Sequence, residues 1–340
     1  MISVSAIRHL VSFDHFIGLS GRHGLFEHAQ RSLPRLDHGY SLDDNGRALV
    51  VVARATASGI GFPSTPRERC LDFVLEAQKG GWKDRQSTAG VWNRTASDDS
   101  IGRAIWGLGS AAVWWPGERG RERAEEGLTR SLDFDSKWWR SCGYALLGFT
   151  AFNAVRPNPS IVGAIARLSR ELPRLRRESD SWLWPEERLR YDNARLPEAL
   201  ISSGQALDDP KMVDEGLRLL EWLVETEIGE HGFSFTPVTG RSIGHPKPSF
   251  DQQPLEAWAM ADACARAAEV TGDVGWLVPA GVAVSWFLGE NDQRIPVYDF
   301  ESGACCDGLT AEGVNLNQGA ESTLSALGAL LALRRPASAP

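Results

Sequence analysis

Three aspartates stand where they could move protons to and from a bound sugar. Asp99, Asp192 and Asp251 each lie at the start of a segment rich in alanine and other apolar residues. Cleavage of a glycosidic bond uses two carboxyl groups, one as general acid and the other as base or nucleophile. We therefore take these aspartates as candidate catalytic residues for inverting glycoside hydrolysis, with Asp99 paired with Asp192 or Asp251.

Further polar and aromatic residues around the same segment starts could hold the substrate. Two acids stand side by side at Asp43–Asp44 and again at Asp98–Asp99, whereas a helix N-cap needs only one. The doubling favours a role beyond capping. The predicted substrate contacts are His38, Tyr40, Asp43, Asp44, Trp82, Asp98, Trp139, Trp184, Tyr191, Gln252, Gln253, Glu256, Asp307, Asn317, Gln318 and Glu321.

Many of these acids also have a structural interpretation. Four could be N-caps, each stabilising its helix by about 1 kcal/mol. These are Asp44, Asp99, Asp192 and Asp251. Glu256 and Glu321 could instead be buried acids paired with arginine. The arginines that follow an acid by about one helical turn are Arg47, Arg103 and Arg195.

Tryptophan is unusually frequent, with 13 residues against 4 tyrosines. Its flat face can stack on the apolar face of a sugar, although core packing is the more common role. The tryptophans that precede acidic segment starts are Trp82, Trp92, Trp138, Trp139, Trp182 and Trp184. We expect these to form the walls of a sugar cleft. Those assigned to packing inside helices are Trp106, Trp222, Trp276 and Trp286.

A sugar isomerase or epimerase is the second hypothesis, in which histidine replaces carboxylate as the proton carrier. The predicted apolar helices contain no histidine, and only His38 and His245 lie in loops that lead into them. The sequence contains no HxxxH or His/Cys cluster with metal-ligand spacing. We therefore predict neither a metal nor a cofactor.

A weak internal repeat indicates the elements that must position these residues. Asp44-Asn45-Gly46-Arg47-Ala48 is matched by Asp192-Asn193-Ala194-Arg195, and related starts fall near residues 99, 142, 251 and 317. Successive starts are on the order of 50 residues apart, the length of a helical hairpin with its loops. Each start should begin a closely packed inner helix.

Amphipathic, charged segments alternate with these apolar helices and predict an outer layer. The predicted outer helices are 4–16, 67–79, 118–132, 160–172, 211–227 and 274–288. Twelve alternating helices predict an all-α (α/α)6 toroid, formed by one domain over residues 1–335 with a tail at 336–340. The long loops all lead into inner helices, so one rim should carry the loops and the acids. No GxGxxG turn supports a doubly wound α/β fold instead.

Charge and composition exclude several classes of partner. The 340 residues contain 36 Lys and Arg against 44 Asp and Glu, a net charge of -8, which does not favour nucleic acid. No apolar stretch is long enough for a membrane span. Five cysteines without a framework spacing fit a cytoplasmic protein with reduced thiols. An oligosaccharide or sugar is the expected partner, and the sequence gives no indication of oligomeric state.

Several longer strings resemble a family of bacterial proteins of the six-hairpin glycosidase-like group. They are Leu25–His28, His38–Ala48, Tyr191–Arg195, Phe250–Pro254 and Asp307–Thr323, within residues 20 to 333. Members are often labelled glycosyltransferases and encoded beside mannoside phosphorylases. The resemblance implies a toroid and a carbohydrate context without a reaction. A third hypothesis is therefore a glycan-binding accessory to a transferase.

These inferences combine into one geometric expectation. The acids and the amide at five inner-helix starts should converge on one cavity, with carboxyl pairs about 5 to 9.5 Å apart. These residues are Asp44, Asp99, Asp192, Asp251 and Asn317. Trp82, Trp139 and Trp184 should line that cavity, whereas Trp222 and Trp286 should not.

Overall fold

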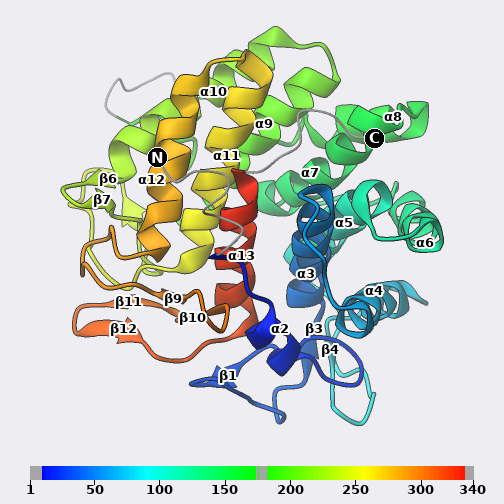
Figure 1. Cartoon of the computed structure of the whole chain (residues 1–340). Helices are drawn as coiled ribbons and strands as arrows, with labels where there is room; N and C mark the ends of the chain where they lie inside the picture. Colours follow the sequence, from blue (N-terminus) through cyan, green and yellow to red (C-terminus); the bar gives the residue numbers. More distant parts are fainter. Residues whose placement is uncertain (1–9, 174, 176–181, 334–340) are drawn as a thin grey trace.

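The computed structural model describes residues 10–173, 175 and 182–333, and its helices form two concentric layers (Figure 1). The inner helices are α3 (Leu42–Ala57), α5 (Asp98–Trp114), α7 (Trp139–Val155), α9 (Arg195–Ala206), α11 (Pro254–Thr271) and α13 (Ala320–Ala332). Each packs against the next, and α13 packs against α3. The inner layer is therefore a closed ring.

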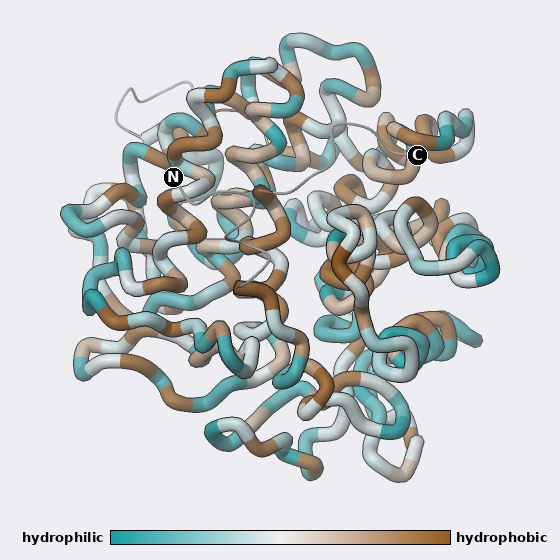
Figure 2. The backbone as a smooth tube through the Cα atoms, in the orientation of Figure 1, coloured by the Kyte–Doolittle hydropathy of each residue, from teal (hydrophilic) through white to brown (hydrophobic). Residues whose placement is uncertain are grey.

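The outer layer consists of helices that each pack on an inner helix. They are α2 (Asp14–Leu19), α4 (Ser64–Gln78), α6 (Glu118–Thr129), α8 (Pro159–Leu168), α10 (Pro210–Glu227) and α12 (Leu277–Phe287), the last preceded by a 3-10 turn at Val274–Trp276. Hydrophobic residues concentrate in the inner helices (Figure 2). The predicted segment 4–16 lies partly outside the described residues, and the predicted tail at 336–340 lies wholly outside them.

The long connections run from outer to inner helices and lie at one end of the ring (Figure 1). They carry short antiparallel pairs: β1 (Ala29–Gln30) with β2 (Leu33–Pro34), β3 (Tyr40–Ser41) with β4 (Arg85–Gln86), β5 (Arg188–Leu189) with β8 (Arg241–Ser242), β6 (Ile228–Gly229) with β7 (Gly232–Phe233), β9 (Tyr298–Asp299) with β10 (Ala304–Cys305), and β11 (Gly308–Thr310) with β12 (Gly313–Asn315). We call this end, where the inner helices begin, the mouth.

The aspartates near the helix starts are not the N-caps. Ser41 caps α3, since its Oγ accepts a hydrogen bond from the backbone N–H of Asp44 at 3.2 Å. Ser97 caps α5 in the same way, with the N–H of Ser100 at 3.1 Å. The starts of α9, α11 and α13 come at 195, 254 and 320, three residues later than predicted. The capping interpretation of Asp44, Asp99, Asp192 and Asp251 is therefore wrong.

Glycines allow the inner helices to approach closely. A Cβ atom on Gly109 of α5 would lie 2.1 Å from the backbone oxygen of Gly148 on α7. Overpacking of this kind costs about 1–3 kcal/mol. We expect Gly109→Ala to lower the free energy of unfolding by that amount in urea. Gly163→Ala is the matched control: Gly163 is exposed on α8 with open space around it, so alanine should be neutral or stabilise by up to about 1 kcal/mol.

A buried ionic and aromatic cluster fills the ring about two turns below the mouth. Trp106 of α5 stacks on Trp258 of α11 with ring centres 5.2 Å apart. Asp262 of α11, which is fully buried, accepts hydrogen bonds from Arg54 at 2.6 and 2.8 Å and from Arg195 at 2.6 Å. We call these five residues the axial plug.

Two further properties concern the described part of the chain as a whole. Its five cysteines, which are Cys70, Cys142, Cys264, Cys305 and Cys306, are buried and form no disulfide. Within the ranges 10–173 and 182–333, no helix combines the length and apolarity that crossing a bilayer requires.

Candidate active site at the mouth of the ring

Two buried arginines hold the acids of the first inner helix. Arg47 contacts Asp43 at 3.3 Å and Asp44 at 3.1 Å, and its second terminal nitrogen donates to Glu321 at 2.7 Å. Arg103 donates to both carboxylate oxygens of Asp43, at 2.9 and 3.0 Å. The two guanidinium groups lower the pKa of Asp43 despite its burial. Through Arg47 and Arg103, the acids of α3 and Glu321 of α13 are linked to α5.

Arg103 extends this network to the opposite side of the ring. Its Nη2 donates to the hydroxyl of Tyr144 at 2.7 Å, and that hydroxyl donates to Asp192 at 2.6 Å. Asp192 itself lies 3.6 Å from Arg103. The structure thus joins Asp44 and Asp192 through a chain of contacts that crosses α3, α5 and α7 and ends in the turn before α9.

Glu256 positions the backbone around Asp192. Asp192 has a left-handed backbone with φ of 51°, which is unfavourable for most residues other than glycine. The N–H groups of Asp192 and Asn193 both donate to the Glu256 carboxylate, the second at 3.2 Å. These bonds hold the turn that precedes α9. Glu256 is therefore a positioning residue rather than a group that faces the solvent.

Burial raises the pKa of Glu256 from 4.5 to about 8, although the backbone donors oppose that shift. The pKa of Asp44 also rises to about 8, for the same reason. Between about pH 4.5 and pH 8, the Glu256 carboxyl group keeps its proton in the folded protein but has released it in the unfolded chain. Glu256 therefore contributes stability at low pH that is lost as the pH rises from about 4.5 towards 8.

We expect Glu256→Gln to flatten the pH dependence of stability. The slope that Glu256 contributes is at most about 1.4 kcal/mol per pH unit. Urea unfolding at pH 5, 6, 7 and 8 measures this slope, and the comparison is between the slopes of variant and wild type rather than their absolute stabilities. Equal slopes would show that Glu256 is already ionised in the folded protein at pH 5.

Asp99 is fixed by two hydroxyl groups from neighbouring segments. The hydroxyl of Ser141 on α7 donates to Oδ1, and that of Tyr191 donates to Oδ2. Arg103 also interacts electrostatically with Asp99. Asp99 remains only partly buried. It is thus an oriented carboxylate within reach of the solvent.

Other predicted contacts at the mouth differ in their access to solvent. The side chain of Asp43 is 26% exposed and that of Glu321 is 39% exposed, whereas Asp44 is 4% exposed. Asp98 is partly buried and accepts a hydrogen bond from Ser136 at 2.7 Å. The acids that a substrate could meet are therefore fewer than the sequence indicates.

Asp251 lies outside the charged network. It is exposed three residues before α11, and none of the described residues forms a hydrogen bond or ion pair with its carboxylate. Gln252 and Gln253 follow it: Gln253 is the first residue before the helix, and Gln252 is fully buried. The Gln252 amide bonds to Trp286, Phe235, Ser249 and Asp292. Gln252 is therefore a structural residue, contrary to its predicted substrate contact.

The polar residues before α13 stabilise the loop rather than face the arginine network. Asp307 accepts hydrogen bonds from the N–H of Gly319 at 2.8 Å and the hydroxyl of Ser322 at 2.6 Å, which ties down the helix start. Asn317 accepts from the N–H of Arg31 at 3.0 Å. The backbone oxygen of Gln318 bonds to His15. The expected convergence of Asn317 with the aspartates is not seen in these contacts.

The aromatic candidates divide by burial. Trp184 is fully buried, stacks on Trp222 and donates to Glu186, so the prediction that it lines an open cavity is wrong. Tyr40 is also buried, against Phe26. Trp82 and Trp139 are partly buried. Sequence spacing alone does not distinguish an aromatic side chain that faces the mouth from one that packs beneath a loop.

The loop histidines His38 and His245 have partners other than the inner-helix acids. The rings of His38 and His28 are 4.8 Å apart, and His38 lies 3.6 Å from Asp37. His245 is exposed and bonds to the backbone oxygen of Ile243. Among the described residues, no group of three or more His, Cys, Asp or Glu side chains could hold a metal ion.

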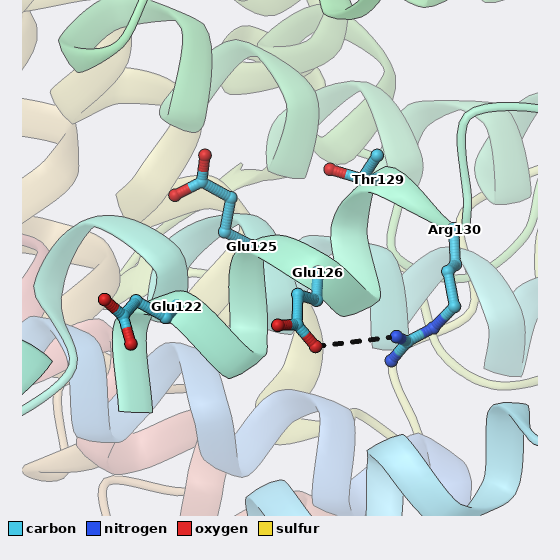
Figure 3. A pocket seen from close by; sticks show the side chains of 5 residues that line it. All are labelled: Glu122, Glu125, Glu126, Thr129 and Arg130. Carbon is cyan, nitrogen blue, oxygen red and sulfur yellow. Dashed lines mark ion pairs between the residues drawn. The ribbon is translucent and has the colours of Figure 1, made fainter. Parts of the chain in front are cut away.

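Two surface recesses are lined by none of the acids of the arginine network. One of about 530 Å³ lies on the solvent face of α6, where Glu126 and Arg130 form an ion pair of 3.8 Å (Figure 3). It is lined by Glu122, Glu125, Glu126, Thr129 and Arg130. Another, of about 830 Å³, lies between the β1–β2 hairpin and Asn317. The α6 recess is formed by one outer helix and receives no inner-helix acid.

Several residues that bind and orient the acids of the mouth were not predicted from the sequence. Tyr144 and Ser141 lie inside apolar α7, and Arg140 opens it. Arg140 donates to Glu186 at 2.9 Å and to Asn193 at 3.0 Å. A polar residue within an apolar helix was the available signal, because a buried hydroxyl or guanidinium requires a partner.

Comparison with known proteins agrees with the ring geometry. No protein-family model matches the sequence, and no curated protein matches it. Among solved structures, cellobiose 2-epimerase from Bacillus thermoamylovorans superposes with a TM-score of 0.71 at 11% identity, over 97% of this chain and 98% of that one. The chain has the (α/α)6 toroid fold. The all-α prediction is thereby confirmed.

Enzymes of different activity share this fold with the protein. A D-mannose isomerase superposes with a TM-score of 0.71 at 11% identity, over 97% of this chain and 96% of the other. A GH76 α-mannanase from Bacteroides thetaiotaomicron gives 0.63 at 14% identity, over 97% and 94%. At these identities the likeness establishes the (α/α)6 toroid fold and no particular reaction.

Proposed function

We propose that the protein is a carbohydrate-active enzyme that hydrolyses a glycosidic bond at the mouth, with Asp99 and Asp251 as its two catalytic carboxylates. The observation that carries this proposal is their placement. In the ring, α5 and α11 are three places apart and so stand opposite each other, as the stacking of Trp106 on Trp258 also indicates. Asp99 is the second residue of α5, and Asp251 lies three residues before α11.

The two carboxylates differ in a way that suits paired chemistry. Asp99 is oriented by Ser141 and Tyr191, whereas Asp251 is exposed and unpaired within the described chain. Hydrolysis needs one group for the leaving oxygen and one for the water or the anomeric carbon. Asp192, the other candidate, is 4% exposed behind Tyr144, so in this proposal it acts through Arg103 as a positioning residue.

Isomerisation or epimerisation of a sugar is the second candidate. It is favoured by the superpositions, since the epimerases and the mannose isomerase give TM-scores of 0.68 to 0.71 and the α-mannanase 0.63. Against it, the inner helices contain no histidine. Loss of a sugar conversion on replacement of His38 or His245 would support this candidate.

Product analysis with manno- and gluco-oligosaccharides tests the proposal. Each sugar is incubated with and without phosphate, and products are separated by chromatography and identified by NMR. A new reducing end indicates hydrolysis, a sugar phosphate indicates phosphorolysis, and an altered sugar with its linkage intact indicates epimerisation. Binding without any product would contradict the proposal and favour a glycan-binding accessory.

A further inference from the structure

Tyr191 is an exposed aromatic residue whose orientation is nevertheless fixed. It is 38% exposed, and its hydroxyl donates to Asp99. The guanidinium carbon of Arg140 lies over one face of the ring, 5.1 Å from its centre, and Nε of Arg140 donates to the backbone oxygen of Tyr191 at 2.5 Å. One ring face is thus covered and the hydroxyl is anchored.

The residues that fix the orientation of Tyr191 are themselves fixed by contacts within the chain. The Arg140 side chain is 6% exposed and pairs with Glu186 and Asn193. The next residue, Asp192, is anchored to Glu256 through its backbone N–H. A ring fixed in this way loses little conformational freedom when a ligand stacks on it.

We propose that the open face of Tyr191 is a subsite for an uncharged sugar ring, which stacks there with its edge beside Asp99. This inference deepens the proposed function and rests on it. An aromatic face contacts the C–H face of a pyranose, and a neighbouring carboxylate accepts hydrogen bonds from hydroxyl groups. Both components are present at Tyr191.

The charges around the subsite select against anionic sugars. Three arginines of the mouth are buried and paired with acids of the chain: the side chains of Arg47, Arg103 and Arg140 are 3%, 6% and 6% exposed. Arg85 is 31% exposed and is paired with Glu27. Arg190, which is exposed beside Tyr191, pairs with Glu186 at 3.4 Å. Asp43 and Glu321 keep exposed carboxylates. A phosphate or uronate group would therefore meet like charge, which disfavours its binding.

Binding calorimetry with matched disaccharides tests this inference. The probes are cellobiose and mannobiose, each compared with a derivative that carries a carboxylate at C6. Measurements use the Asp251→Asn background, in which turnover is expected to be lost, alone and combined with Tyr191→Phe, Tyr191→Ala or Phe300→Ala. Phe300 is a matched control because it is an aromatic residue that is 53% exposed in the β9–β10 turn, on a different loop from Tyr191.

We expect Tyr191→Ala to weaken binding of a neutral disaccharide about 10-fold, a loss typical of one stacking contact. Tyr191→Phe, which keeps the ring, should stay within about threefold, and Phe300→Ala should not change the affinity. The acidic derivative should bind at least about 10-fold more weakly than its neutral parent, and the difference should narrow at high salt.

Two results would overturn the subsite while leaving the proposed function intact. These are unchanged affinity for the neutral disaccharides when Tyr191→Ala is added to the Asp251→Asn background, or equal affinity for acidic and neutral disaccharides. If the protein with Tyr191 intact binds neither neutral probe and cleaves no glycan, neutral or acidic, the subsite and the proposed function both fail. Cleavage of acidic glycans alone would remove the subsite's selectivity but not the hydrolysis.

Discussion

Asp99→Asn is expected to lower kcat on a cleaved glycan by about 10²- to 10⁴-fold, the contribution usual for a positioned acid or base. Asparagine keeps the shape of the side chain and can still accept one hydroxyl hydrogen bond, but it cannot take up a proton. Circular dichroism and the midpoint of urea unfolding should stay close to wild type, because Asp99 does not cap α5. Chromatographic product analysis measures the loss.

Asp251→Asn should produce a loss of the same order, since the two carboxylates act on one bond. Glu301→Gln is the matched control, because Glu301 is an exposed acid in the β9–β10 turn and contacts none of the mouth residues. Full turnover in both Asp99→Asn and Asp251→Asn would contradict the assignment of these two aspartates as catalytic residues. If only Asp192→Asn lost turnover, Asp192 itself would be a catalytic residue.

The helical architecture could be predicted because it depends on periodic apolar positions. The segment 211–227, predicted as an outer helix, lies within α10, and 105–113 lies within α5. Helix starts were less predictable. In Asp192-Asn193-Ala194 the residues form a left-handed turn held by Glu256, a contact between residues far apart in sequence that no local pattern contains.

The site could be predicted only in part, for a related reason. The acids of the mouth stand in a recognisable repeat, so Asp43, Asp99 and Glu321 could be found from their positions alone. Their partners could not: Tyr144 and Arg140 meet Asp192 and Glu186 only after the ring closes. Trp184 was misassigned because its distance from Asp192 in sequence does not indicate whether the loop covers it.

Asp262→Ala is expected to lower the free energy of unfolding by about 3–5 kcal/mol, because removal of one partner leaves a buried charge uncompensated. Asp262 accepts hydrogen bonds from Arg54 and Arg195, and it is fully buried on α11. Glu198, which lies 2.7 Å from Arg195, remains as a partner of that arginine in the variant. Urea unfolding followed by far-UV circular dichroism measures the change.

Glu269→Gln provides a matched control on the same helix. Its ion pair with Arg266 at 2.8 Å involves a side chain that is 50% exposed, and surface pairs contribute about 0–1 kcal/mol. A loss below 1 kcal/mol in Asp262→Ala would mean that the stacked Trp106 and Trp258 hold the axial plug without the ions. A loss of about 3–5 kcal/mol would mean that the ion pairs of Asp262 hold α3, α9 and α11 together beneath the mouth. The relative placement of Asp99 and Asp251 would then depend on these ion pairs.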